Sequence, residues 1–136
     1  MSLAVRYGEG SLSVSQIAKK EGLSVAYLEQ ILNRLKKKGF VKSVRGPQGG
    51  YVLMKKPSEV RLNALLDILD DQDLEDPGKI TLSPETDETA VANLLFWKKF
   101  KSSIETALAA VTLKDLIDEA RQLKKSKSRT QYAFHI

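Results

Sequence analysis

The sequence predicts a mainly α-helical protein with one small β-hairpin and a long helix in its C-terminal half. Two short helical patterns lie only three or four residues apart between residues 13 and 38. Two short β-branched runs that flank a glycine-rich segment follow them, and residues 89–111 then contain neither glycine nor proline. A chain of 136 residues suffices for one compact core with an extension, but not for two independent cores.

The first helical pattern opens with a capping box. Gln16 lies three residues after Ser13, so the serine hydroxyl can accept from a backbone N–H of the first turn while the glutamine side chain accepts from the backbone of Ser13. Gly22 ends this helix, and Ser24 supplies a second N-cap. So short a connection between two helices is the spacing of a helix-turn-helix.

The second helix is predicted from residue 25 to residue 38. Apolar side chains recur along one of its sides: Val25, Leu28, Leu32 and Leu35. This spacing predicts that the four side chains are buried. The opposite side is polar and rich in hydrogen-bond donors, and three lysines precede Gly39, which suits the C-terminal end of a helix.

Residues 40–45 and 51–54 are predicted to form a β-hairpin. They contain several valines and are joined by Gly46-Pro47-Gln48-Gly49-Gly50. A phosphate-binding loop is the alternative for this glycine-rich segment. It is disfavoured because no Lys-Ser/Thr pair follows and because a strand, not a helix, comes next.

A further helix is predicted from about residue 63 to residue 71, and residues 72–88 are predicted to form an acidic loop. Pro77, Gly78 and Pro84 interrupt any regular pattern there. The carboxylates of this loop could bind a hard cation, but the ligand spacing of an EF-hand is missing. A solvated acidic loop is therefore the favoured interpretation.

The long helix is predicted from residue 89 to residue 111 and would measure about 34 Å. This exceeds what an N-terminal domain of about 70 residues can cover, so we expect a second copy of the chain to bury its apolar face. Packing wholly on its own domain is the alternative. The predicted dimerisation residues are Leu94, Trp97, Ile104, Leu108 and Val111, and a second apolar row, formed by Val91, Leu95, Phe96 and Phe100, widens the face. Thr112 is predicted to cap a shorter helix that ends near Leu123, before a basic run and an apolar-ended tail.

Charge is distributed unevenly along the chain. Residues 1–62 carry 12 Lys/Arg against 4 Asp/Glu, residues 63–90 carry 1 against 9, and residues 91–136 carry 9 against 4. The basic N-terminal part favours a polyanionic partner, because lysines and arginines that neutralise phosphates release counterions. A merely solvated basic surface is the alternative.

Composition excludes several classes of function. The chain has no cysteine, which rules out disulfides, thiolate catalysis and metal clusters held by cysteines. Its single histidine, His135, supplies too few ligands for a usual zinc site. It lies next to the last residue, in a position that is poorly placed for a catalytic base. No signal peptide or membrane span is recognisable. We therefore expect a cytoplasmic protein that is not an enzyme, uses no cofactor and does not bind membranes.

Four motifs stand out along the chain: Tyr-Leu-Glu-Gln-Ile-Leu at 27–32, Arg-Leu-Lys at 34–36, Gly-Phe-Val-Lys-Ser-Val-Arg-Gly-Pro-Gln-Gly-Gly-Tyr at 39–51, and Thr-Leu-Lys-Asp-Leu at 112–116. They resemble those of the Rrf2 family of bacterial winged-helix transcriptional regulators. The resemblance thus extends over nearly the whole chain, although residues 3–8 resemble only the end of the family's first helix. Members that carry an iron–sulfur cluster have three cysteines in the region matching residues 72–90. This chain has none, so it resembles the cysteine-free branch, and through its aromatic tail most of all the repressor of cysteine metabolism.

The resemblance implies a winged helix-turn-helix with a long C-terminal dimerisation helix. Residues 1–62 would bind DNA, residues 63–90 would form a connecting helix and the acidic loop, and residues 89–136 would form the dimerisation helix and tail. The second helix of the helix-turn-helix would enter the major groove, and the hairpin, or wing, would enter the minor groove. The DNA-binding residues would be Ser24, Ala26, Tyr27, Glu29, Gln30 and Arg34 from the helix, and Ser43, Arg45, Gly46 and Pro47 from the wing.

These implications favour a homodimeric regulator, a repressor that binds a palindromic operator in double-stranded DNA. Its signal would come from a small-molecule effector or a partner enzyme. The alternative is a protein-interaction module with a winged-helix fold that signals through a partner enzyme and not through DNA. Salt dependence separates the two functions, because phosphate contacts make DNA binding weaken steeply as salt rises.

Overall fold

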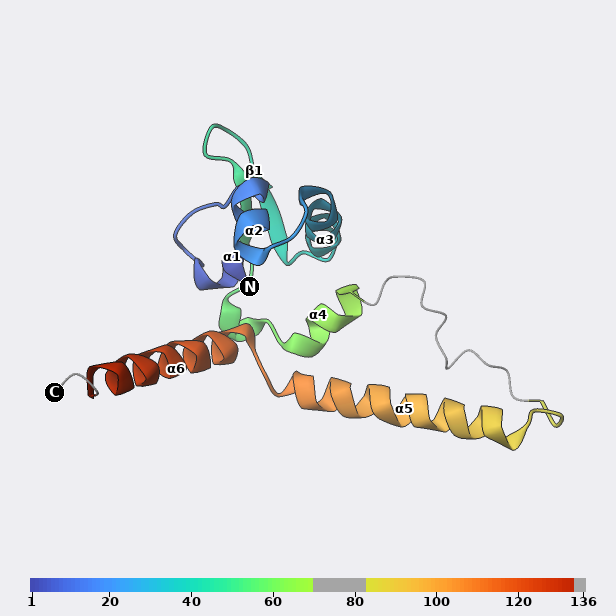
Figure 1. Ribbon diagram of the computed structural model, residues 1–136. Coiled ribbons are helices and arrows are strands. Elements are labelled where there is room, and N and C mark those ends of the chain that lie inside the picture. Colours follow the sequence, from blue (N-terminus) through green and yellow to red (C-terminus); the bar gives the residue numbers. More distant parts are fainter. Residues whose placement is uncertain (70–82, 134–136) are drawn as a thin grey trace.

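A computed structural model describes residues 1–69 and 83–133, and side chains up to residue 127. The elements are α1 (Ser2–Val5), α2 (Val14–Glu21), α3 (Val25–Lys37), β1 (Val41–Val44), β2 (Gly50–Leu53), the 3-10 turn η1 (Pro57–Glu59), α4 (Leu62–Leu69), α5 (Glu88–Ala109) and α6 (Leu113–Ala133). Helices α1 to α3 and the hairpin form a compact domain, below which α5 and α6 extend in opposite directions (Figure 1). Most of the predicted acidic loop lies outside the described residues, as does the end of the predicted tail.

Hydrogen bonds at both sides of the turn define the helix-turn-helix. The Gln16 backbone N–H donates to Ser13 Oγ over 3.1 Å, and the Ser13 N–H donates to Gln16 Oε1 over 2.9 Å, which confirms the capping box. Gly22 ends α2 with a φ of 64°, a left-handed conformation that glycine adopts without steric cost. The Ser24 hydroxyl then accepts from the Tyr27 N–H and begins α3.

The buried side of α3 agrees with the predicted pattern except at its first residue. Leu28 and Leu32 are buried in the core, and Leu35 is half-buried against it. Val25, which was predicted to be buried, is 46% exposed. It directly follows the N-cap, where the first turn of the helix extends beyond the edge of the core. The prediction for Val25 is therefore wrong.

The hairpin is joined to the entrance of the helix-turn-helix. Strands β1 and β2 pair antiparallel, with Val41 opposite Leu53 and Val44 opposite Gly50. Leu12 adds an isolated bridge to Tyr51, through two backbone hydrogen bonds of 3.0 and 2.8 Å. The two backbones approach so closely that a Cβ atom on residue 50 would lie 2.1 Å from the Leu12 carbonyl oxygen. Only glycine fits there, and the wing is held against the residue that precedes α2.

One hydrophobic core includes residues from both ends of the chain. Its members are Ala4, Leu12, Ile17, Ala18, Leu28, Leu32, Phe40, Val41, Val60, Ile68, Leu113 and Ile117. The first turns of α6 therefore pack into the same core as the helix-turn-helix. The buried residue of α5, Leu94, lies outside this cluster. The core thus joins residues of α4 and α6 to the N-terminal helices and the hairpin.

Helix α6 is longer than predicted. It begins as expected at a cap, where the Asp115 N–H donates to Thr112 Oγ1 and the Thr112 N–H donates to Asp115 Oδ2 over 2.9 Å. This second hydrogen bond lowers the pKa of the Asp115 carboxyl below its usual value. The helix continues to Ala133 and not to Leu123, because no glycine or proline interrupts it and because most residues after Leu123 have good helix propensity. The predicted basic run is therefore helical.

Candidate nucleic-acid interface

The exposed side of α3 carries most of the side chains predicted to contact DNA. Ala26, Tyr27 and Gln30 are spaced three and four residues apart, which places them on one side of the helix. All three are exposed, as are Ser24 and Glu29, whereas Leu28 between them is buried. Tyr27 is 50% exposed. The helix therefore presents an aromatic ring, an amide and a carboxylate outward, while Arg34, one turn beyond Gln30, is half-buried.

The wing presents a second exposed group of the predicted residues. Ser43 lies on β1, Arg45 directly follows that strand, and Gly46 and Pro47 form part of the tip. All four are exposed. The Lys36 ammonium group donates to Ser43 Oγ over 3.0 Å, so a side chain from the last turn of α3 reaches the wing. Sequence reasoning missed this contact, because Lys36 was interpreted only as one of three lysines at a helix end.

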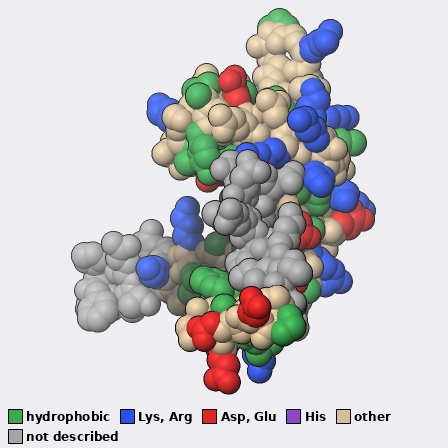
Figure 2. All heavy atoms as spheres, turned by 90° about the vertical axis from the view of Figure 1, so that its right-hand side faces the viewer, with side chains coloured by type: hydrophobic (Ala, Val, Ile, Leu, Met, Phe, Trp, Pro, Cys, Tyr) green, Lys and Arg blue, Asp and Glu red, His purple; other side chains and the backbone are tan. Residues whose placement is uncertain are grey.

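Basic side chains dominate the domain that carries these two elements. Residues 13–51 contain eight Lys/Arg and two Asp/Glu, and Figure 2 shows Lys and Arg side chains gathered over the upper part of the face it views. Within the described residues, none of the Lys and Arg side chains from 19 to 45 forms an ion pair. Their charges remain available to attract phosphates.

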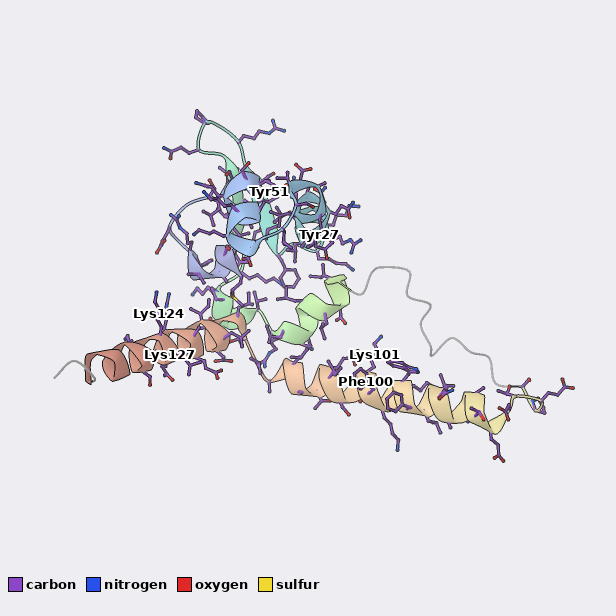
Figure 3. All side chains as sticks on the ribbon, in the orientation of Figure 1. Tyr27, Tyr51, Phe100, Lys101, Lys124 and Lys127 are labelled. Atoms are coloured by element: carbon purple, nitrogen blue, oxygen red, sulfur yellow. The ribbon has the colours of Figure 1, made fainter. Side chains whose placement is uncertain are left out.

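The large apolar side chains that the long helix α5 leaves exposed come mostly from the second of its two predicted apolar rows. Among the five predicted dimerisation residues, Leu94 is buried, Ile104, Leu108 and Val111 are half-buried, and Trp97 is 48% exposed. The large apolar side chains that α5 exposes are Leu95 and the rings of Phe96, Trp97 and Phe100, and these three rings are here called the α5 aromatic face. Phe100 is labelled in Figure 3.

The three rings of the α5 aromatic face contact one another. The ring centroids of Phe96 and Trp97 are 5.4 Å apart, and those of Trp97 and Phe100 are 5.7 Å apart, in edge-to-face arrangements. Such contacts order the rings before any partner binds. Periodicity could not identify this row, because both rows of α5 are apolar and the choice between them depends on how α4 packs against α5.

The side chains of this protein do not supply the ligands of a metal centre held by cysteines. The sequence has no cysteine. Among the residues that the structure describes, no group of three or more His, Cys, Asp or Glu side chains is placed to hold a metal ion. In the same part of the chain, no helix has the length and hydropathy needed to cross a membrane.

Comparisons with known proteins agree on one family. The sequence profile of the Rrf2 family, described as "Iron-dependent Transcriptional regulator", matches residues 1–119. The regulator CymR of Bacillus subtilis is 32% identical over 116 residues, which cover 85% of this chain and 79% of that protein. Among solved structures, T. potens IscR matches with a TM-score of 0.66 and 38% identity, covering 88% of this chain and 77% of that one. The structure of CymR, described as the global cysteine regulator of B. subtilis, also has a TM-score of 0.66, at 30% identity, and covers 87% of this chain and 86% of its own.

Proposed function

The chain belongs to the Rrf2 family of DNA-binding transcriptional regulators, and on that premise we propose that it is a repressor that binds a palindromic operator as a homodimer. The main support is the exposed, donor-rich side of α3, which lies beside an exposed wing on a basic domain. The partner is double-stranded DNA, and the site of action is the cytoplasm.

Each half-site is read by the two exposed groups of residues. Gln30 suits adenine, with which its amide can pair bidentately, and Glu29 suits the amino group of cytosine. Arg45 suits a narrow minor groove, where the negative potential attracts a guanidinium group. The remaining residues position the domain through phosphates and sugars, as most protein contacts to DNA do. They are Ser24, Ala26, Tyr27, Arg34, Ser43, Gly46 and Pro47.

Two copies join through α5. The three rings of the α5 aromatic face form an exposed apolar patch, and such a patch favours burial by a partner. A two-fold axis brings the same row of both chains together, because an isologous interface uses one surface twice. Trp97 belongs both to this row and to the residues predicted from the sequence. Leu94, Ile104, Leu108 and Val111 support the row from the inner side of the helix.

The signal reaches this regulator without an iron–sulfur cluster. Cluster ligation uses several cysteine thiolates, and this sequence contains none. We propose a small-molecule effector or a partner enzyme in place of the cluster.

Selection from a random duplex library tests the function. We expect an enriched palindrome whose half-sites lie one or more whole helical turns apart. Gln30→Ala should relax base preference at one position of each half-site by about 1–3 kcal/mol. Arg45→Ala should weaken binding to the selected duplex, whereas Arg121→Ala removes the same charge from the exposed part of α6 and should leave binding unchanged.

Salt dependence provides the second measurement. A dimer that makes about 6–10 phosphate contacts should lose roughly 10³–10⁵ in affinity between 50 and 200 mM salt. If no palindrome is enriched, the proposal of a repressor is wrong. Partner binding that ignores salt over this range would favour the protein-interaction module instead.

A further inference from the structure

Two segments meet at a junction between the DNA-binding domain and α5. Residues 60–62, which lead into α4, run beside residues 111–113, which lead from α5 into α6. The Leu62 N–H donates to the Val111 carbonyl over 2.9 Å, and the Leu113 N–H donates to the Val60 carbonyl over 3.0 Å. Arg61 and Thr112 form an isolated antiparallel bridge between these two hydrogen bonds. The two strand-like segments are therefore joined on both sides of Arg61.

The side chain of Arg61 reaches past this bridge to the end of α5. Its Nη1 donates to the carbonyl oxygen of Ala109 over 2.7 Å. Ala109 is the last residue of α5, and the last carbonyls of a helix lack intrahelical partners and carry partial negative charge. A guanidinium group is well suited to that end. Arg61 thus caps α5 with a charge supplied by the segment that leads out of the DNA-binding domain.

The junction is anchored in the hydrophobic core of the DNA-binding domain, whereas α5 lies outside that core. Val60 is 1% exposed and Leu113 is 6% exposed, and both belong to the hydrophobic core. Helix α5 has no residue in that core, and α4 is the helix that packs along it. Figure 1 shows α5 leaving the junction in the direction opposite to α6. The direction of α5 relative to the DNA-binding domain is therefore set at Arg61 and by α4.

We propose that Arg61 is a positioning residue that fixes the angle between α5 and the winged helix, and thereby the half-site spacing that the dimer accepts. This inference rests on the proposed function. A helix of 22 residues is about 33 Å long, so a tilt of about 10° at one end moves the other by about 6 Å. In duplex DNA this is close to two base-pair steps of about 3.4 Å. When α5 pairs two chains, a small error in its angle therefore misplaces one recognition helix relative to the other.

Binding to a spacing series tests the inference. The selected palindrome is prepared with its natural half-site separation and with one or two base pairs inserted or removed, together with a duplex that carries a single half-site. We expect the wild type to prefer the natural spacing by about tenfold or more. Arg61→Ala should reduce this preference to within about threefold, because the alanine variant holds α5 less firmly. Binding to the single half-site and the dimeric native mass should stay unchanged.

Two further variants serve as comparisons. Arg61→Lys keeps the positive charge and the ability to donate but loses the shape of the guanidinium group, so its spacing preference should lie between those of wild type and Arg61→Ala. Arg121→Ala removes an exposed arginine from α6 and should keep the wild-type preference. If circular dichroism shows that Arg61→Ala is unfolded, the spacing preference of Arg61→Lys is compared with that of wild type. A weaker preference in Arg61→Lys supports the inference, and an equal one overturns it.

The outcomes separate the inference from the proposed function. A wild type that binds no duplex overturns both. If the wild type shows a sharp spacing preference and the Arg61 variants retain it, only the inference is overturned, and the proposed function stands. Loss of single half-site binding in Arg61→Ala also overturns it, because Arg61 would then act on the DNA-binding surface itself and not on the angle of α5.

Discussion

Gly50 shows how a single residue can hold the wing in place. Its backbone passes the Leu12 carbonyl at a distance that no side chain tolerates, since an added Cβ would lie 2.1 Å from that oxygen. We expect Gly50→Ala to lower the free energy of unfolding by about 1–3 kcal/mol, the usual cost of local backbone strain. Urea denaturation followed by circular dichroism measures this loss.

Gly46 is the matched control for that substitution. It also has a positive φ, of 117°, but nothing lies within 4 Å of the Cβ that would be added. Gly46→Ala should therefore cost less than Gly50→Ala. Equal losses for the two variants would mean that the contact with Leu12 contributes nothing to the stability of the wing.

Asp115 gives the fold a specific response to acid. The hydrogen bond from the Thr112 N–H lowers the pKa of the Asp115 carboxyl in the folded chain. This carboxyl therefore stabilises the folded state above its unfolded pKa of about 3.9, and the contribution is lost as pH falls through the lower folded value. We expect the Tm of wild type to fall more than that of Asp115→Asn between about pH 5 and pH 2.

Glu119→Gln is the control for the acid response. It removes a carboxyl from an exposed position of the same helix, outside the cap. Its Tm should follow the wild-type pH dependence closely. If the pH dependence of Tm is weakened equally in Glu119→Gln and Asp115→Asn, the effect comes from net charge and not from the cap.

The sequence predicted single residues well where local chemistry decides their position. The hydroxyls of Ser13, Ser24 and Thr112 can each accept from the backbone N–H three residues later, and all three of these hydrogen bonds are present. The outward position of Tyr27 follows equally from the burial of its neighbour Leu28. The hydrogen bonds of Lys36 and Arg61 could not be foreseen, because each joins residues that only tertiary packing brings together.

At the scale of elements, α5 is where periodicity was least informative. The helix was expected and its bounds lie within a few residues of the prediction, but two apolar rows competed for the inner side. The row with Leu94 turned inward, and the α5 aromatic face remained outside. Hydrophobic pattern alone cannot rank two such rows, because the ranking comes from a neighbouring helix.

The α5 aromatic face leads to a prediction about assembly. Phe100→Lys places a charge within the row that we propose two chains share, and a charge that loses its water without a partner is costly. We expect native mass spectrometry to show a shift from dimer to monomer, with helical content retained. Ser102→Lys, which adds the same charge at an exposed position outside the α5 aromatic face, should leave the dimer intact.

Helix α6 was predicted too short for a physical reason that concerns the whole element. The polar run after Leu123 has no apolar periodicity, and periodicity was the basis of the prediction. Helix propensity, without a glycine or proline to interrupt it, continues the helix without burial. All seven side chains from residue 121 to residue 127 are exposed.

At the scale of the whole molecule, folding and assembly should be linked. If a second copy covers the α5 aromatic face, it binds the folded chain and not the unfolded one, so mass action stabilises the folded state as protein concentration rises. We expect the Tm from calorimetry to increase with concentration for wild type. It should vary much less for Phe100→Lys, and a wild-type Tm that ignores concentration would contradict the homodimer.

The placement of Leu113 and Ile117 in the core has a practical consequence for anyone who wishes to isolate the DNA reader. In three dimensions the long helix is an insertion into a domain whose last piece comes from the far side of that insertion. A fragment cut after residue 62 would open a gap lined by Val60 and its neighbours, and it should be soluble only poorly or not at all. A self-sufficient minimal reader would instead need residues 1–69, which include the core residue Ile68, together with the start of α6.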